Sequence, residues 1–208
     1  FFNLVGRNIL YTDFFKILSS KNDIKVVLLV PSGKKDIFEK GFGAHRIIIE
    51  EIKFLRPSKI NLLLHLISWH LLSTRSKKIH KLVQLKKSHN YFIFFLTSFL
   101  ARLGKFSMVR RIFRVMDYLL MPRSGYDDLF NKYNPDLVLA TAMQDLRMQE
   151  LSDTTLIREA KRKHVISVGM GRSWDSMTTK GLLRILPDKL VVQTEDIKSQ
   201  AIKYHGVD

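Results

Sequence analysis

The chain has 208 residues, of which 46% are apolar, and this length and composition suffice for one large domain with a substantial core. It contains no cysteine, which excludes a disulfide framework and thiolate metal sites. Its formal net charge of +16 favours a polyanionic partner: an anionic membrane face, a nucleic acid or a phosphorylated ligand.

The first fifty residues alternate short apolar runs with segments of helical length. This alternation is typical of βαβ units and a parallel sheet. The predicted elements are a strand over Phe1–Val5, a helix from Ile9 to Leu18, a strand over Ile24–Val30, a helix over Lys34–Lys40 and a strand over Arg46–Glu50.

The turn after the first predicted strand is a candidate anion site. Gly6 permits a tight turn from strand to helix, and Arg7 and Asn8 are candidates for binding an anionic substrate group at the N-terminus of the next helix. A solvated turn is an equal alternative, because one glycine is not a dinucleotide-binding fingerprint.

Nearly all of the excess positive charge lies in one segment. From Lys53 to Met116 there are 14 basic residues and no aspartate or glutamate, whereas the rest of the chain has 21 basic and 19 acidic residues. The basicity therefore belongs to an insert over about residues 53–120, which is predicted to be helical throughout. Its predicted helices are Ile60–Leu72, Arg75–Lys87, Tyr91–Leu100 and a fourth over 106–120.

In the fourth helix, Arg110, Arg114 and Asp117 are predicted to lie opposite an apolar face. The apolar face consists of Phe106, Val109, Phe113, Met116 and Leu120.

Two of these helices, Ile60–Leu72 and Tyr91–Leu100, are almost wholly apolar, and neither reaches the roughly 18 residues needed to span a bilayer. One interpretation is a protein that rests on an anionic membrane face, and the other is a pair of core helices with a solvated basic rim. Nucleic acid is a less favoured partner, because the aromatic side chains in the second run are expected to be buried rather than available for base stacking. Those aromatic residues are Tyr91, Phe92, Phe94 and Phe95.

A narrow polar stripe is expected on the helix Ile60–Leu72, formed by Asn61, His65 and Ser68.

Four histidines in the basic segment do not predict a metal site. His65 and His70 are five residues apart, which does not place them on one helix face, and no carboxylate lies near them in sequence. His80 and His89 are scattered in the same way, and we expect neither a metal nor another cofactor.

The stretch from Asn134 to Asp208 repeats the alternation of strands and helices. Its predicted strands are Leu137–Ala140, Val165–Met170 and a run within Pro187–Val192, with a helical segment ending at His164. Together with the first fifty residues, this stretch predicts one Rossmann-like, doubly wound parallel sheet in a single domain over residues 1–208.

In such sheets ligands bind beyond the carboxyl ends of the strands. Gln144 and Asp145 follow the first of these later strands and are candidates either for substrate contacts or for capping the next helix, with capping preferred. A polar loop from Arg172 to Lys180, bounded by Gly171 and Gly181, follows the second strand. This loop is the principal candidate site.

Three segments carry a resemblance to a known family, and they read NPDLVLAT, REAKRKHVISVGMGRSWDSMTTKG and PDKLVVQTEDIKSQAIKYHGVD. In their order and motifs they resemble the N-terminal domain of GT-B fold glycosyltransferases, and more narrowly bacterial surface-polysaccharide glycosyltransferase-like proteins with a Ser-Trp-Asp loop. The resemblance covers about Val26–Pro31 and Asn134–Asp208. It implies an acceptor-side domain, with most of the nucleotide-sugar site in a second Rossmann-like domain that this chain lacks.

The resemblance assigns the Arg172–Lys180 loop to glycosyl transfer. An inverting transfer needs a base on the acceptor hydroxyl and cations near the departing diphosphate. Asp175 is the candidate base and Trp174 the candidate platform for a sugar face. The remaining candidates are Arg172 and Lys180 for phosphate or a charged acceptor, and Ser173, Thr178 and Thr179 for sugar hydroxyls.

The alternatives for this loop are structural. Trp174 would then pack as a plug between domains, and Asp175 would cap a turn or pair with Arg172. A retaining enzyme would not need the base.

The expected function is therefore sugar transfer from a nucleotide-sugar donor, bound through the missing domain, to a cell-surface or lipid-linked glycan acceptor. Such an enzyme would be cytoplasmic and peripheral on the inner face of the cell membrane, and this domain alone is expected to be inactive. A nucleotide-sugar epimerase or a polyol-phosphate transferase of the same fold is one alternative. A non-catalytic binding module or a basic nucleic-acid-binding module is the other.

Overall fold

The computed structural model describes residues 9–43, 45–53, 56–122, 125–143 and 152–207. The chain divides into two compact units, Phe1–Leu55 and Arg56–Asp208. The predicted first strand over Phe1–Val5 lies outside the described residues. Each unit is described below by itself.

The first unit contains a two-stranded parallel sheet. Strand β1 (Val26–Pro31) pairs with β2 (Ile47–Ile52) over six residues, beginning with Val26 opposite Ile47. Helix α3 (Lys35–Phe42) connects them. Glu51 accepts hydrogen bonds from the backbone N–H groups of Gly33 and Lys35 at 2.8 and 3.1 Å, which fixes the turn that leads into α3. The parallel pairing expected for this region is confirmed.

Helix α2 (Asp13–Ser20) supplies the core of the first unit together with the sheet. Leu10, Phe15, Leu28 and Ile47 form its buried cluster. The helix predicted from Ile9 to Leu18 is interrupted at Tyr11 and Thr12, where the Thr12 hydroxyl donates to the Ile9 carbonyl at 2.8 Å.

The second unit contains a three-stranded parallel sheet in the order β3-β4-β5. Its strands are β3 (Leu137–Ala140), β4 (Ile166–Met170) and β5 (Lys189–Val191). Asp188 joins β5 to β4, because its carboxylate accepts from the Ser167 backbone N–H at 2.8 Å and from the Ser167 hydroxyl at 2.6 Å.

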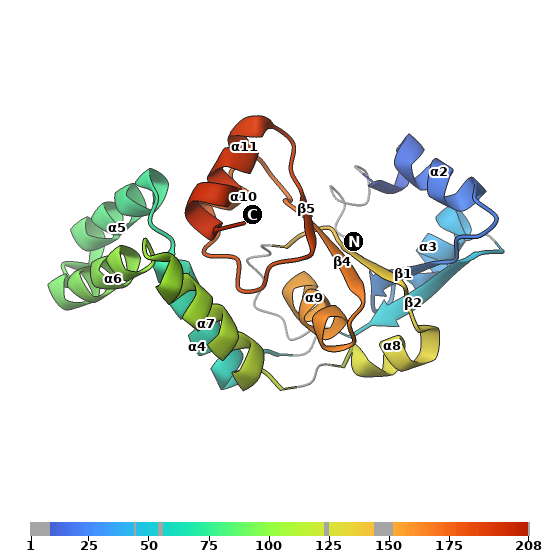
Figure 1. Ribbon diagram of the computed structural model, residues 1–208, viewed down its shortest axis with the longest axis horizontal. Coiled ribbons are helices and arrows are strands. Elements are labelled where there is room, and N and C mark those ends of the chain that lie inside the picture. The colour runs from blue at the N-terminus through green and yellow to red at the C-terminus, as the bar shows by residue number, and fades with distance from the viewer. Residues whose placement is uncertain (1–8, 44, 54–55, 123–124, 144–151, 208) are drawn as a thin grey trace. The chain divides into compact units, whose positions relative to one another are not determined.

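Helices of the second unit precede and follow these strands. Helix α8 (Asp127–Tyr133) ends at Asn134, which has a φ of 39°. Helix α9 (Asp153–Arg162) crosses from β3 to β4 and packs against both (Figure 1). The remaining elements are α10 (Ser176–Thr179), α11 (Glu195–Gln200) and the π-helical turn η1 (Ala201–His205).

The predicted mixed α/β architecture with parallel strands is thus confirmed. The described strands form two sheets, of two and three strands, and each belongs to its own unit. The union of both sheets into one doubly wound sheet stays a prediction.

The basic segment folds into four helices, as expected from its sequence. They are α4 (Lys59–Leu71), α5 (Arg75–Ser88), α6 (Tyr91–Leu103) and α7 (Ser107–Leu120). Side chains cap three of them at the N-terminus: Ser58 accepts from Asn61 N–H, Thr74 from Lys77 N–H and Asn90 from Ile93 N–H.

Helices α6 and α7 meet at a sharp bend of 102°. Gly104 stands at this bend, and a Cβ there would lie 1.9 Å from the Leu71 carbonyl oxygen. A glycine is required because the end of α6 comes this close to the end of α4.

Two polar side chains of α4 lie inside the second unit. Asn61 and Ser68, expected on a polar stripe of α4, are buried. The Ser68 carbonyl accepts from Leu182 N–H at 2.9 Å, and the Asn61 side chain accepts from Arg184 at 2.6 Å. These polar groups are buried because they bind the segment before β5.

The predicted faces of α7 are corrected by the structure, because Phe113 and Asp117, which were predicted on opposite faces, are both buried. Asp117 is fully buried and binds two arginines, Arg158 on α9 and Arg184, the latter at 2.6 Å. Arg114 donates to the backbone carbonyls of Leu183 and His205. The charged face therefore points into the unit.

Much of the apolar face of α7 is correspondingly exposed. Phe106, Met116 and Leu120 are 61%, 46% and 50% exposed, whereas Phe113 is buried in a cluster with Leu64. Val109 also packs against this cluster, so the predicted apolar face is divided between the interior and the surface.

Candidate functional site

The Arg172–Lys180 loop begins at the carboxyl end of β4, as predicted. Gly171 N–H donates to the Val191 carbonyl at 3.2 Å, and the Gln193 side-chain amide donates to the Gly171 carbonyl at 2.7 Å. The start of the loop is therefore fixed to the end of β5. This is the edge of a parallel sheet at which ligands bind in α/β proteins.

Asp175 is the acceptor at the centre of this loop. The Ser173 hydroxyl donates to its Oδ1 at 2.5 Å, and the Thr179 hydroxyl donates to its Oδ2 at 2.9 Å. The Lys180 ammonium lies 4.0 Å from Oδ2. Three of the predicted site residues are thus brought together around the predicted base.

These contacts set the protonation of the carboxyl group. The hydrogen bond from Ser173 is the largest cause that lowers the pKa of Asp175, with further contributions from Thr179 and Lys180, while burial opposes them. Asp175 is consequently an ionised acceptor of reduced basicity at neutral pH. The same contacts fit the alternative in which Asp175 orders the turn, and its role as a base stays a prediction.

Trp174 is a large apolar side chain that is 77% exposed. It does not pack as a plug within the second unit. Its neighbour Arg172 is also exposed, and Thr178 and Lys180 are half-buried. The loop thus presents an exposed indole next to an ionised carboxylate.

The base of the loop is buried and anchored by a residue that the sequence did not indicate. His205 has no exposed surface. Its Nδ1 accepts from Leu183 N–H at 3.0 Å, so Nε2 carries the proton and donates to the Met177 carbonyl at 2.8 Å. Burial is the main cause that lowers the pKa of His205 to about 4, which keeps the ring neutral.

The junction of α4 and α5 forms a wall beside the loop. The Thr74 hydroxyl donates to the Thr178 carbonyl at 2.7 Å. Gly181 has a φ of 99°, and a Cβ there would lie 3.1 Å from the Trp69 Cα. The loop and the basic helices are therefore in direct contact.

A buried lysine lies in this wall and was also missed by sequence reasoning. Lys77 is 4% exposed, and its Nζ lies 2.9 Å from the centroid of the Trp69 ring. Burial, followed by the charges of Lys81 and Lys180, lowers the pKa of Lys77 to about 7. A lysine in a run of basic residues ordinarily indicates a solvated helix face, so no sequence signal marks this one as buried.

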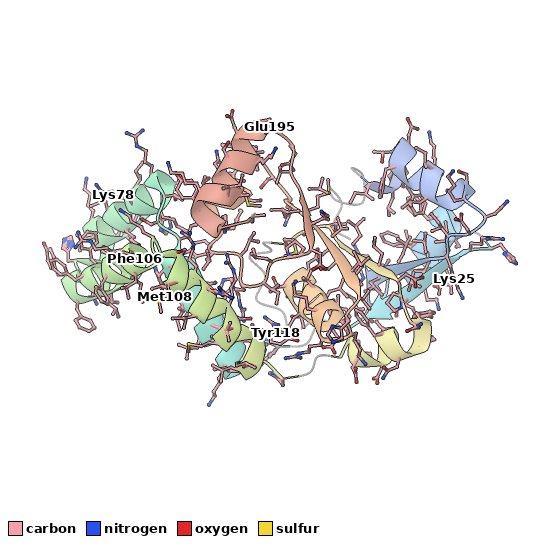
Figure 2. All side chains as sticks on the ribbon, viewed as in Figure 1. Lys25, Lys78, Phe106, Met108, Tyr118 and Glu195 are labelled. Carbon is pink, nitrogen blue, oxygen red and sulfur yellow. The ribbon has the colours of Figure 1, made fainter. Side chains whose placement is uncertain are left out.

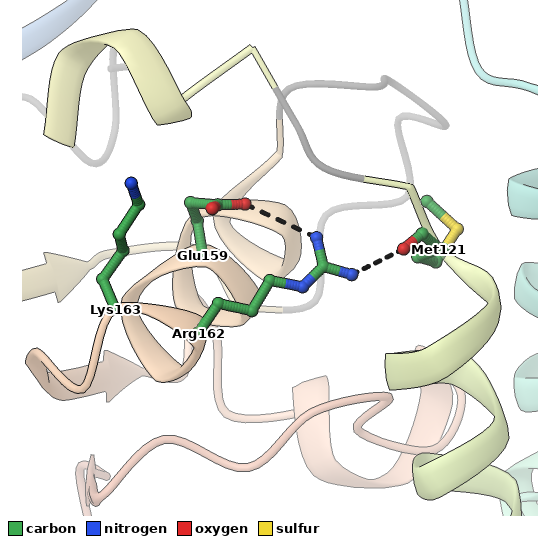
Figure 3. Close-up of a pocket in the computed structure, with 4 residues that line it drawn as sticks. All are labelled: Met121, Glu159, Arg162 and Lys163. Carbon is green, nitrogen blue, oxygen red and sulfur yellow. Dashed lines mark hydrogen bonds and ion pairs between the residues drawn. The ribbon is translucent and has the colours of Figure 1, made fainter. Parts of the chain in front are cut away.

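A separate hollow of about 440 Å³ is lined by Met121, Glu159, Arg162 and Lys163 (Figure 3). Arg162 donates to the Met121 carbonyl at 2.5 Å and lies 3.5 Å from Glu159. The hollow adjoins the end of α9, at the edge where β4 begins. It is opposite the edge that carries the predicted loop, and we do not assign it to the same site.

Five predicted contacts fall outside the described residues. They are Gly6, Arg7, Asn8, Gln144 and Asp145. The described residues just before the last two, Ala142 and Met143, are buried after β3.

The described histidines and carboxylates form no group of three or more that is arranged to hold a metal ion. His70 is half-buried, and burial followed by the charges of Lys81, Lys77 and His80 lowers its pKa to about 4. Its surroundings are cationic rather than suited to a cation.

Comparisons of the chain with protein-family models, with curated proteins and with solved structures gave no match.

Proposed function

We propose that the protein is the acceptor-binding part of a glycosyltransferase that transfers a sugar from a nucleotide-sugar donor to a cell-surface or lipid-linked glycan. In this proposal the two sheets belong to one Rossmann-like, doubly wound sheet of the first half of a GT-B architecture, and a second domain holds the donor. The enzyme works at the cytoplasmic face of the membrane.

The observation that carries the proposal is the Ser173–Trp174–Asp175 turn at the carboxyl edge of β4. Trp174 offers an exposed ring for the apolar face of a sugar, and Asp175 offers an ionised acceptor for its hydroxyls. Lys180 lies beside that carboxylate and supplies positive charge for a phosphate group. These groups match the three needs of the reaction: orienting a sugar, accepting a proton and stabilising an anion.

The lowered pKa of Asp175 bears on how the base would act. A carboxylate with two hydroxyl donors is a weak base while those bonds persist, so in this proposal the acceptor hydroxyl replaces Ser173 or Thr179 as a donor to Asp175. That exchange places the acceptor hydroxyl, whose proton is to be removed, directly on the carboxylate of Asp175.

The test uses the full-length protein, with its donor-binding second domain, and measures transfer of radiolabelled sugar from a panel of UDP-sugars and GDP-sugars to a lipid extract that contains polyprenyl-diphosphate glycans. Asp175→Asn is expected to reduce kcat by roughly 100-fold or more, the usual scale for loss of a general base. Trp174→Ala is expected to raise KM for the acceptor by about tenfold, through lost contact with the sugar face.

Ile37→Ala is the matched control, because Ile37 is 68% exposed and lies in the other unit. It should leave both constants unchanged. Normal turnover by Asp175→Asn would remove Asp175 as the base, and absence of transfer from every donor by the unsubstituted protein would refute the proposal.

A further inference from the structure

The outer surface of α6 is apolar along its whole length. Of its thirteen residues, Thr97 alone is buried. Phe92, Phe95 and Phe99 are 76%, 68% and 58% exposed. The expectation of burial is therefore wrong for Tyr91, Phe92 and Phe95, whereas Phe94 is half-buried.

Helix α7 continues this surface beyond the bend. Met108, Ile112, Val115 and Leu119 recur every three or four residues, so they share one face of the helix. Their exposed fractions range from 48% to 72%. Phe106 and Met108 lie where this face begins (Figure 2). We refer to the exposed apolar residues of α6 and α7 together as the α6–α7 apolar surface.

The inner sides of the same helices include buried polar contacts. The Lys81 ammonium donates to the Thr97 carbonyl between α5 and α6, and both residues are buried. Asp117 on α7 is fully buried against Arg158 and Arg184. Turning the α6–α7 apolar surface inward would break these contacts and leave the charged groups without their partners. Its exposure is therefore fixed by the packing.

An ordinary water-soluble helical domain buries most of its large apolar side chains, whereas α6 and the outer face of α7 expose theirs. Contiguous exposed apolar patches of this kind mark a surface that binds a partner or a membrane. The partner must accommodate both aromatic and aliphatic side chains along two helices.

The charge around the surface selects among possible partners. Arg102, Lys105 and Arg111 are exposed at or near the bend, and Lys86 and Lys87 are exposed at the end of α5. A second copy of the chain would bring the same positive charge to the interface and be repelled. Anionic phospholipid matches the positive charge at its headgroups and the apolar surface at its acyl chains.

Nucleic acid matches the charge but not the apolar chemistry. Tyr91 and the phenylalanines of α6 can stack on bases, whereas Met108, Ile112, Val115 and Leu119 offer neither a stacking plane nor a hydrogen bond. Half of the surface would therefore be buried against a polar polyanion without compensation.

The lengths of the helices define how they enter a bilayer. In the described parts of the chain no single helix is long and apolar enough to cross a membrane, whereas α6 and α7 meet that test only as a bent pair. Helix α6 is roughly 20 Å long, compared with about 30 Å for the hydrocarbon core.

We infer that α6 and α7 insert their apolar surface into one leaflet of an anionic membrane, with the flanking lysines and arginines at the headgroups. The loop that carries Trp174 and Asp175 lies in the same unit and contacts α5 through Thr74. Inserted helices therefore hold this loop near the lipid surface. It follows, if the proposed function holds, that the acceptor is a lipid-linked glycan rather than a soluble one.

Flotation with vesicles tests the inference directly. The protein is expected to float with vesicles of phosphatidylcholine and phosphatidylglycerol, and to remain bound at high salt because the acyl-chain contacts are not screened. The double substitution Phe95→Ser with Leu119→Ser should reduce the bound fraction by roughly tenfold or more, since it removes two large apolar groups from the lipid contact.

Ile37→Ser serves as the matched control, because it removes an equally exposed apolar side chain from the first unit. It should float like the unsubstituted protein. Circular dichroism melting should show no loss of stability in any variant, since the replaced side chains are exposed.

A second measurement does not depend on removing a side chain. The chain has no cysteine, so Phe99→Cys gives one attachment point for a fluorophore that responds to polarity. Its emission should shift to the blue on addition of the anionic vesicles, and that of Ile37→Cys should not.

Three results would overturn the inference. They are unchanged emission from position 99 with vesicles, retention on nucleic acid without vesicle binding, and a dimer that the double substitution dissociates without vesicle binding. Vesicle binding without any sugar transfer would instead refute the proposed function and leave the inference intact.

Discussion

His205 links the end of the chain to the buried base of the Trp174 loop. Both ring nitrogens are engaged in the neutral form, because Nδ1 accepts from Leu183 N–H and Nε2 donates to the Met177 carbonyl. Protonation of Nδ1 would remove its acceptor and place a charge in a site already close to Arg114 and Arg110. Protonation of His205 in acid would therefore weaken the contacts that support the loop.

This arrangement predicts a loss of stability in mild acid. The pKa of His205 is about 4 in the folded chain and about 6.5 when unfolded, so between these values the unfolded chain binds more protons. The free energy of unfolding should fall by about 3 kcal/mol as the pH decreases from 6.5 to 4, and be restored as the pH rises.

Urea denaturation at a series of pH values measures this slope. His70 contributes in the same direction, since its pKa is also lowered to about 4. His205→Gln should therefore remove part of the slope and leave the remainder. An identical slope in this variant and in the unsubstituted protein would contradict the assignment.

At the same scale, the sequence located the loop but not its supports. Ser173, Trp174 and Asp175 follow an apolar run, so their place at a strand end could be read from the order of residues. Lys77 lies 96 residues before Ser173, and His205 lies more than 30 residues after it. Neither belongs to a local sequence pattern, because their burial depends on long-range contacts.

The orientation of α7 depends on one buried carboxylate. Asp117 binds Arg158 on α9 and Arg184 before β5, which lie 41 and 67 residues further along the chain. The three side chains are each at least nine-tenths buried. This network fixes the helix against the sheet and determines which face meets solvent.

Removing the carboxylate should be strongly destabilising. Asp117→Ala leaves two buried arginines without their counter-ion, and we expect a loss of about 3–5 kcal/mol in the free energy of unfolding. Guanidinium denaturation followed by circular dichroism measures it. Asp13→Ala, which breaks an exposed pair with Lys16, is the control and should change stability little.

A loss in Asp117→Ala no larger than that of the control would show that the network does not hold α7. Asp117→Asn separates charge from shape, because it keeps the size of the side chain. Its stability should lie between those of the alanine variant and the unsubstituted protein.

Hydrophobic periodicity predicted the elements but not which side of them faces water. The predicted strands Leu137–Ala140 and Val165–Met170 agree with β3 and β4 to within one residue. Periodicity shows which residues share one face of a helix or strand. Which face is buried is then assigned by assuming that apolar side chains lie inside. That assumption fails for the exposed apolar residues of α6 and α7. The inner side of α6 accepts a hydrogen bond from Lys81, and that of α7 carries the ion pairs of Asp117.

For the whole molecule, the sequence predicted parallel strand pairing and a helical basic segment, and both are confirmed. It also predicted one sheet, whereas the described strands form two sheets in two units. The order of strands along a chain indicates parallel pairing locally. Which strands become neighbours across a long insertion is determined by contacts that no local pattern records.

Most of the excess positive charge and the exposed apolar surface lie in the same segment of the chain. The segment with 14 of the 35 basic residues also carries the α6–α7 apolar surface and contacts the Trp174 loop. One unit thus combines the surface proposed to enter the lipid with the turn proposed to bind the sugar. Glycan transfer and membrane insertion should therefore depend on each other.

The most direct measurement of that dependence compares two acceptors that carry the same glycan. One is anchored by a polyprenyl diphosphate in anionic vesicles, and the other carries a short water-soluble chain. Phe95→Ser with Leu119→Ser is predicted to lose transfer to the vesicle acceptor by roughly tenfold or more while retaining transfer to the soluble one. Equal transfer to the vesicle acceptor by this variant and by the unsubstituted protein would contradict the account.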